Sequence, residues 1–445
     1  MPGTIFLSAV LVLPPVTLAR PVEIRAKLVT GGSFSGKVQG WDGTSLRGTF
    51  GQRAWTDLAP ADLKRIFLQL MDRTNSAQWL ALAELLASTP AGEPLSADVF
   101  RQATNHGASA EDLAAARARA QAARDAEAAR TAADSSRRLQ TGAAAQPPAP
   151  WPTVSQADRD QANATTRQRA REALSILASA QDPVETRSFI VASDLPPEET
   201  ARLATSLEAA IQLELRLLGL PDDSAPFASK PLVVLCRTED SYKVAQAALF
   251  KHPAPAGQRA DLILTGPDVA LSAWRGSDLR QMTADLLRQT ALGVLYRTRS
   301  PAPLPPWLAS GIADWVAATS VADSPVDGQR RAPALQFLRQ GGNVLAVMAS
   351  TPEAGTWPGP QGVGPAVGYL LVELLMAERP QQFGPWVLML KEGQPFDQAL
   401  RTVYGTDAAN VASGAVAWYR TNDGGPPANP QPNTPKLPRQ RTPGR

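Results

Sequence analysis

The stretch ETRSFIVASDLPPEETARLATSLEAAIQLELRLLGLP (185–221) decides the fold predicted for the larger part of the chain. It opens with a short apolar run that is typical of a buried strand. Asp194 and the double proline after it are typical of a helix start, and Gly219 with Pro221 is typical of a helix end. The stretch therefore predicts a strand, a turn and a long helix.

The next residues along the chain add more strands and then become mostly helical. Three apolar segments predict strands: KPLVVLCRT (230–238), ADLILTG (260–266) and VALSAW (269–274). From Asp278 to about Thr421, apolar residues recur at helical spacing. Strands followed by helices are typical of an α+β fold, so we expect one mixed sheet backed by a helical subdomain over residues 169–421.

Residues 21–59 show a different pattern, in which apolar and polar residues alternate between glycine turns. This spacing predicts short strands joined by tight turns, and we expect a small SH3-like β-barrel. We place Trp41 and Trp55 in its core, because so small a barrel needs large side chains to fill it. A ligand-facing position for both tryptophans is the alternative.

Helical periodicity takes over in residues 60–140, whose last part is rich in alanine and arginine and has almost no large apolar side chains. We expect that part to form a solvated, projecting helix, since no leucine or isoleucine seam supports a coiled coil. Residues 141–168 are predicted to be a Pro/Ala-rich linker that ends in the start of a helix. The Pro-rich basic tail, residues 422–445, is predicted to be disordered.

Charge and cysteine content narrow the classes of function. The formal net charge is +3 over 445 residues, and the sequence has no basic stripe with interleaved aromatic residues, so we expect no nucleic-acid partner. The single cysteine, Cys236, lies in an apolar run. We expect it to be a buried side chain rather than a nucleophile.

The N-terminus favours export. Residues 5–13 are apolar and residues 17–19 offer a small-residue exit for signal peptidase, although no lysine or arginine precedes the run. We expect a signal peptide over residues 1–20 and a periplasmic or cell-envelope protein, with a first strand and a cytoplasmic protein as the alternative. The run is too short to span a bilayer and no other stretch is a candidate, so no integral membrane segment is expected.

Two segments in the helical part carry a more specific pattern: LLRQTALGVLY (286–296) and PPWLASGIADW (305–315). Together with the strand order and AVGYLLVELLMAERPQQFGPW (366–386), they resemble the peptidase-MA-like gluzincin proteins of bacteria over about residues 187–419. The resemblance implies a gluzincin-like mixed sheet with a helical subdomain. It also implies a helix with an H-E-x-x-H zinc motif and a third zinc ligand, a glutamate, from the second segment.

In this chain the residues of that zinc site are replaced. Aligned with the family motif, Arg288 and Leu292 stand in the places of the two histidines, and Gln289 stands in the place of the general base. Ser310 stands in the place of the third ligand. Asp314 keeps the place of the acid that orients the first histidine in the family.

These replacements remove the chemistry of the motif. An arginine side chain is not deprotonated to bind zinc, leucine has no lone pair, and an amide is a weak base. The two histidines of the chain, His106 and His252, do not share a helix face with a second ligand. We therefore expect no metal ion, no other cofactor and no catalytic residue at this site.

Arg288 and Asp314 occupy positions that contact each other in the family, so we predict a direct salt bridge between them across the altered site. The alternative is that both are exposed helix residues that face water. Trp307 and Trp315 recur at helical spacing and are expected in the core. Together with Tyr369 they are also the candidates for lining a residual cleft, where a peptide could bind by strand addition.

These observations favour a non-catalytic peptidase-like protein, a pseudoenzyme that acts as a protein- or peptide-binding or scaffolding module of the cell envelope. A hydrolase of the metallopeptidase family with relocated catalytic residues is one alternative. A structural envelope protein, in which the barrel, the projecting helix and the tail matter more than the cleft, is another. An open groove would favour binding, and a filled one would favour the structural role.

Overall fold

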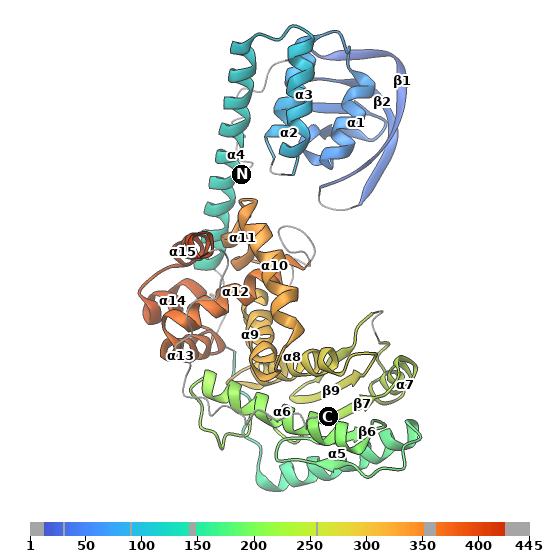
Figure 1. Ribbon diagram of the computed structural model, residues 1–445, viewed down its shortest axis with the longest axis vertical. Coiled ribbons are helices and arrows are strands. Elements are labelled where there is room, and N and C mark those ends of the chain that lie inside the picture. Colours follow the sequence, from blue (N-terminus) through green and yellow to red (C-terminus); the bar gives the residue numbers. More distant parts are fainter. Residues whose placement is uncertain are drawn as a thin grey trace, which may run out of the picture. The chain divides into compact units, whose positions relative to one another are not determined.

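The structure is a computed structural model that describes residues 13–29, 32–89, 91–141, 148–254, 257–350 and 362–422. The chain divides into two compact units, Met1–Ala133 and Asp134–Arg445, and each is described by itself (Figure 1). Most of the predicted signal peptide, residues 1–12, and nearly all of the predicted disordered tail lie outside the described residues. In the part that is described, no helix is both long and apolar enough to cross a membrane.

The first unit opens with an antiparallel sheet in the order β1-β2-β3-β4. Its strands are β1 (Val16–Lys27), β2 (Ser33–Trp41), β3 (Ser45–Gly48) and β4 (Gly51–Ala54). The predicted closed barrel is wrong: within the described residues the sheet stays open, and the segment after β4 meets the end of β1 at a single bridge between Leu28 and Leu58. The chain turns into a helix at Pro60, which leaves no length for a fifth strand.

Helices pack on this sheet and share its core. They are η1 (Trp55–Asp57), α1 (Pro60–Leu70), α2 (Ser76–Ala87), α3 (Glu93–Asn105) and α4 (Ala110–Thr141). The rings of Trp41 and Trp55 each lie 4.9 Å from that of Phe67 in α1, measured between centroids, and both tryptophans are buried. Their predicted core position is confirmed, and the sheet and helices form one unit around one core.

The helix predicted to be solvated, α4, is packed over its first turns. Ala116 and Ala120 are buried in the core of the first unit. Arg119 donates to Glu84 of α2, with Nη2 2.9 Å from Oε2, and Glu84 is itself buried. The prediction of a helix is confirmed, but its first half is anchored through alanine packing and this ion pair.

The second unit contains a five-stranded mixed sheet in the order β5-β6-β7-β9-β8. Its strands are β5 (Val184–Glu185), β6 (Ile190–Ser193), β7 (Leu232–Cys236), β8 (Ala260–Thr265) and β9 (Asp268–Trp274). The three central strands are parallel, and β5 and β8 are antiparallel edge strands. The predicted mixed sheet is confirmed, and Cys236 is fully buried in its central strand, as expected.

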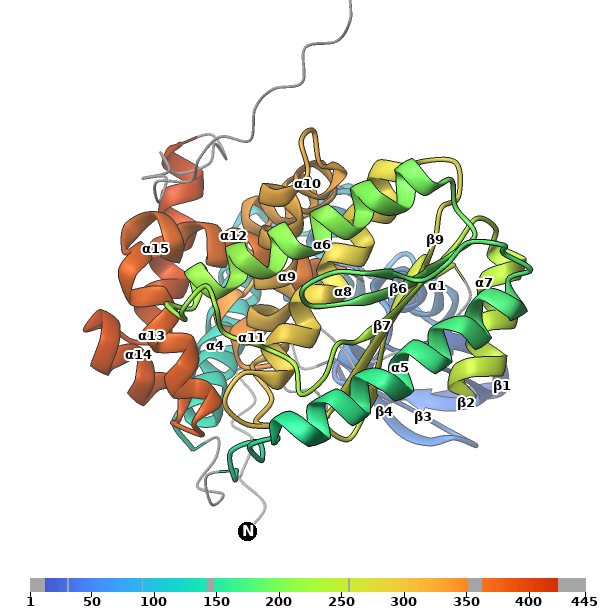
Figure 2. The same cartoon turned by 90° about the horizontal axis from the view of Figure 1, so that it is seen from below.

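Helices cover both faces of this sheet (Figure 2). α5 (Gln156–Ile176) and α7 (Glu239–Ala245), followed by η2 (Gln246–Phe250), pack on one face. α6 (Pro197–Leu217) and α8 (Leu279–Arg297) pack on the other. α5 begins within residues 141–168, whose end was predicted to start a helix. Trp151 before it donates from Nε1 to the carbonyl oxygen of Tyr296 at 3.1 Å, so the sheet unit starts earlier than residue 169.

The rest of the second unit is helical, as predicted. Its helices are α9 (Pro306–Ser320), α10 (Pro325–Arg339), α11 (Val344–Met348), α12 (Val363–Glu378), α13 (Pro380–Lys391), α14 (Phe396–Tyr404) and α15 (Ala408–Thr421). α9 lies between α8 and α12 and crosses α12 closely. At that crossing Gly311 faces Gly368, where a Cβ atom on either glycine would overlap backbone atoms of the other helix.

Candidate functional site

The two segments singled out in the sequence form neighbouring helices, α8 and α9. Asp278 caps α8 by accepting a hydrogen bond from the backbone N–H of Arg280 at 2.9 Å. The double proline before α9 starts that helix, and its apolar residues bury it on most sides. The two helices pack side by side, which places Arg288 of α8 opposite Asp314 of α9.

Asp314 is the centre of a buried charge cluster. Its carboxylate is fully buried and accepts a hydrogen bond from Nε of Arg288, so the predicted salt bridge is confirmed and the water-facing alternative is wrong. A second arginine, Arg330 of α10, donates from Nε to the other oxygen at 2.7 Å. Arg330 was not predicted, because nothing in the sequence indicates which face of α10 packs against α9.

The other residues at the positions of the zinc motif have separate environments. Gln289 lies beside the sheet, with Nε2 3.5 Å from the carbonyl oxygen of Ala260. Ser310 donates its hydroxyl to the carbonyl oxygen of Pro306 at 2.7 Å, within its own helix. Leu292 is half-buried. Of these positions, the structure joins Arg288 and Asp314 by a hydrogen bond, and Gln289 lies beside Arg288 on the pocket wall.

Trp307, Trp315 and Tyr369 do not line a cleft, and that prediction is corrected. Trp307 is fully buried and donates from Nε1 to the carbonyl oxygen of Met348 at 3.1 Å. Trp315 is 8% exposed, so both tryptophans take the core position that the sequence favoured. Tyr369 is buried and donates to Asp327 at 3.0 Å; its pKa is raised, chiefly by burial. These rings fill the spaces between α9 and its neighbours.

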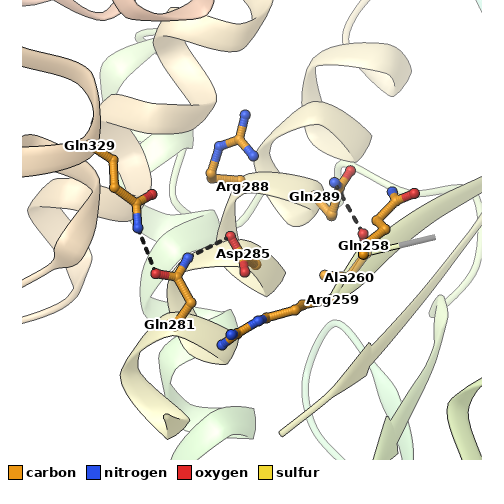
Figure 3. A pocket seen from close by; sticks show the side chains of 9 residues that line it. Gln258, Arg259, Ala260, Gln281, Asp285, Arg288, Gln289 and Gln329 are labelled. Carbon is orange, nitrogen blue, oxygen red and sulfur yellow. Dashed lines mark hydrogen bonds between the residues drawn. The ribbon is translucent and has the colours of Figure 1, made fainter. Parts of the chain in front are cut away.

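A polar pocket of about 440 Å³ opens beside Arg288 (Figure 3). Four of its lining residues lie on α8, three lie in the loop just before β8, one is the first residue of β8 and one lies on α10. They are Gln281, Asp285, Arg288, Gln289, Gly257, Gln258, Arg259, Ala260 and Gln329. The α8 wall could have been predicted from the sequence, since polar residues at 281, 285, 288 and 289 recur at helical spacing.

A chain of amides runs across one wall of the pocket. Gln329 donates to Gln281 at 2.7 Å, and Gln281 donates in turn to Asp285 at 3.0 Å. Burial raises the pKa of the Asp285 carboxyl. The hydrogen bond from Gln281 and the positive charges of nearby arginines partly offset this increase. The wall thus presents polar atoms held in fixed directions.

The donor set of the pocket does not fit a zinc ion. Zinc in proteins binds histidine, cysteine and carboxylate groups, whereas this pocket offers guanidinium groups, amides and the Asp285 carboxyl. Asp314 is already bound by two cations. His252 lies on the loop after η2, 3.8 Å from Asp261, and His106 belongs to the first unit, stacked on Trp79. Chemically, the arrangement is suited to hydrogen bonding and charge recognition.

In comparisons with known proteins, no family model matches the chain and no curated protein matches it significantly.

Proposed function

We propose that the protein is a non-catalytic peptidase-like binding protein, a pseudoenzyme with a gluzincin-like second unit that binds a peptide segment in the cell envelope. The observation that carries the proposal is the position of the polar pocket at the outer edge of β8, the last strand of the sheet in the described part of the chain. Ala260, the first residue of β8, is part of the pocket lining. A peptide that pairs with this edge would therefore extend directly into the pocket.

The register of β8 identifies the backbone groups that are available at this edge. Trp274 donates its N–H to the carbonyl oxygen of Arg259 at 2.9 Å, and Ala260 stands opposite Ala273. Hydrogen-bonded and non-bonded pairs alternate in an antiparallel ladder, so the backbone groups of Leu262 and Leu264 point away from β9, as do those of Ala260, whose carbonyl oxygen already accepts the hydrogen bond from Gln289. β8 is the last strand in the order of the sheet. These groups are the ones that strand addition uses.

Strand addition explains how such a site would bind without catalysis. Backbone hydrogen bonds to the edge supply affinity, and side chains on alternate residues of the peptide enter neighbouring pockets and supply specificity. Here one face of β8 is covered by α8, whose polar residues form the pocket wall. Peptide side chains on that face would meet the guanidinium and amide groups described above.

Peptide binding can be tested with a library of N-acetylated hexapeptides incubated with the full-length protein. Peptides that co-elute with the protein in gel filtration are identified by mass spectrometry, and the affinity of an enriched peptide is measured by titration calorimetry. We expect a small set of enriched sequences. A library that shows no enrichment over a blank column overturns the proposal.

A proline at the edge tests the mode of binding. Leu264→Pro removes one outward N–H and none of the bonds to β9, whereas Leu264→Ala removes the same exposed side chain and keeps the N–H. We expect the proline variant to bind an enriched peptide about tenfold more weakly and the alanine variant to bind it normally. Equal binding by both variants rules out strand addition at this edge.

The non-catalytic part of the proposal has its own test. We expect the purified protein to contain no stoichiometric zinc, and added zinc not to raise its melting temperature. Tight one-to-one zinc binding, or cleavage of the library peptides, contradicts this part of the proposal.

A further inference from the structure

The charged groups around the pocket carry more positive than negative charge. Arg288 and Arg330 share the single carboxylate of Asp314, so this buried cluster has one surplus positive charge. Arg259 adds a third guanidinium, and Asp285 is the acidic side chain among the described lining residues. Even with Asp285 ionised, the described lining and the Asp314 cluster together hold three arginines and two aspartates. A further aspartate, Asp261, lies outside this set and accepts hydrogen bonds from Gln246 and Gln258.

Asp285 is not paired with these arginines. Its Oδ1 atom accepts the hydrogen bond from Gln281, which Gln329 holds in place, and no ion pair joins Asp285 to an arginine in the described part of the chain. The three arginines nevertheless lie close enough to lower its pKa, against the larger effect of burial. The Asp285 carboxyl is therefore hydrogen-bonded to the Gln281 amide and is not ion-paired with an arginine of the described residues.

Guanidinium N–H groups consequently remain available to a ligand. Arg288 uses Nε on Asp314, and its two Nη atoms form no hydrogen bond within the described residues; the side chain is 19% exposed. The guanidinium of Arg259 likewise forms no hydrogen bond or ion pair there. Its Cζ atom lies 5.7 Å from the centre of the Trp274 ring, a contact that restrains the group beside the pocket. Figure 3 shows both arginines among the lining side chains.

From these observations we infer that the pocket binds a carboxylate of the peptide, either an aspartate or glutamate side chain or a free C-terminus. This inference rests on the peptide-binding function proposed above and names the group that enters the pocket. A carboxylate neutralises the surplus charge and accepts paired hydrogen bonds from a guanidinium, whereas an amide of the same shape carries no charge and offers one acceptor oxygen beside an NH2 donor. A cavity of about 440 Å³ has room for an acidic residue with its adjoining backbone.

The hexapeptide library decides between the sources of the carboxylate when it is made twice, once with a free C-terminal acid and once with a C-terminal amide. Enrichment of Asp or Glu at one position in both forms identifies a side chain. Enrichment confined to the free-acid form identifies the C-terminus. Enrichment that depends neither on an acidic residue nor on a free C-terminus overturns the carboxylate inference and leaves the proposed peptide binding intact. No enrichment at all overturns both the carboxylate inference and the proposed peptide binding.

Variants then locate the carboxylate at these arginines. We expect replacement of the selected carboxylate by its amide in the peptide to weaken binding about tenfold or more, and Arg259→Gln to abolish that difference. Arg259→Glu is expected to reverse the preference toward Lys or Arg peptides. Arg280→Gln, an exposed site at the start of α8 outside the lining, is the matched control and should bind as the wild type. Retention of the acid preference by Arg259→Gln and Arg259→Glu rules out the assignment to this pocket.

Discussion

At the scale of single residues, Asp314 joins three helices. Its carboxylate lies on α9 and binds Arg288 of α8 and Arg330 of α10, with no exposed surface of its own. Removal of a buried carboxylate with two guanidinium partners lowers the free energy of unfolding strongly, because both cations then lose their counter-ion. Its main contribution here is to fix the relative positions of the helices beside the pocket.

Replacement of Asp314 tests this contribution. We expect Asp314→Ala to lower the free energy of unfolding by about 3–5 kcal/mol, the usual cost of breaking a buried ion pair from one side. Urea unfolding followed by tryptophan fluorescence measures it. Asp285→Asn, which replaces the half-buried pocket acid by an isostere, serves as the control and is expected to change stability by less than about 1 kcal/mol. A change at Asp314 no larger than the control would contradict the cluster's structural role.

Lys391 is a second buried charge, at the end of α13. It is 2% exposed, and its ammonium donates to the carbonyl oxygen of Ala302 at 2.7 Å. Burial lowers its pKa to about 8, from 10.5 in an unfolded chain. The unfolded state therefore binds more protons between these two values, so the free energy of unfolding contributed by Lys391 rises as pH increases through this window.

This linkage predicts a pH-dependent difference between the wild type and Lys391→Met. At pH 7.5 the ammonium is charged in both states and folding bears nearly the full cost of its burial, about 3 kcal/mol. At pH 9.5 most of that cost is gone in the wild type, while the variant has no such slope. The stability of the wild type should therefore rise relative to the variant between these pH values, as measured by urea unfolding. A constant difference would show that Lys391 keeps its ordinary pKa.

Single contacts could be predicted where a sequence pattern relates the two positions, and could not be predicted where the contact depends on how helices pack. The Arg288–Asp314 pair was predictable because a family pattern relates the two positions. Arg330 was not, since its contact depends on the packing of α10, which local periodicity does not specify. The tryptophans were predictable as core residues because their spacing matches the apolar face of a helix, whereas the pocket itself depends on how β8 meets α8.

At the scale of elements, the crossing of α9 and α12 depends on two glycines. A Cβ atom at Gly311 would overlap the carbonyl of Gly368, and one at Gly368 would overlap the carbonyl of Trp307. The obstacle is backbone, which cannot move aside as a flexible side chain would. The close crossing therefore sets the distance between α9, which carries Asp314, and α12.

A pair of glycine-to-alanine variants tests this crossing. We expect Gly311→Ala to destabilise the protein by about 3 kcal/mol or more, at the upper end of the cost of overpacking a core. Gly414→Ala in α15 is the matched control, because nothing lies within 4 Å of a Cβ atom there. It should stabilise the protein by about 0.5–1 kcal/mol through its higher helix propensity. Melting temperatures that move in the same direction for both variants would contradict the packing argument.

For two elements, the prediction from the local sequence pattern differs from the structure. The alternation in residues 21–59 predicted strands correctly, but closure of a barrel requires a further strand after β4, and the chain forms a helix there instead. α5 was predicted only in part, as the start of a helix at the end of residues 141–168. Its sheet-facing side uses small residues such as Ala170 and Ala173, which are fully buried but give a weak hydrophobic period.

At the scale of the whole molecule, the strand-then-helix order of the second unit was predicted from the sequence, but its beginning was not. The segment before α5 belongs to that unit through Trp151, whose ring also lies 4.3 Å from the guanidinium of Arg297. Fragment boundaries should respect these contacts. A fragment cut at residue 169 loses Trp151 and more than half of α5.

Two fragments compare these boundaries. We expect residues 148–422 to fold, with a cooperative thermal transition by circular dichroism. Residues 169–422 should melt at least about 10 °C lower or aggregate, because the face of β6 and β7 that α5 covers would be partly exposed. Equal melting temperatures for the two fragments would show that the first part of α5 contributes little to the unit.

The burial of Cys236 has a practical consequence for kinetics. The chain has one thiol, it lies in the central strand with no exposed surface, and burial raises its pKa. A thiol-specific reagent can therefore modify the native protein only during moments when the centre of the sheet is open. Without any engineered label, the rate of modification counts those openings, and its dependence on reagent concentration separates how often the sheet opens from how long it stays open.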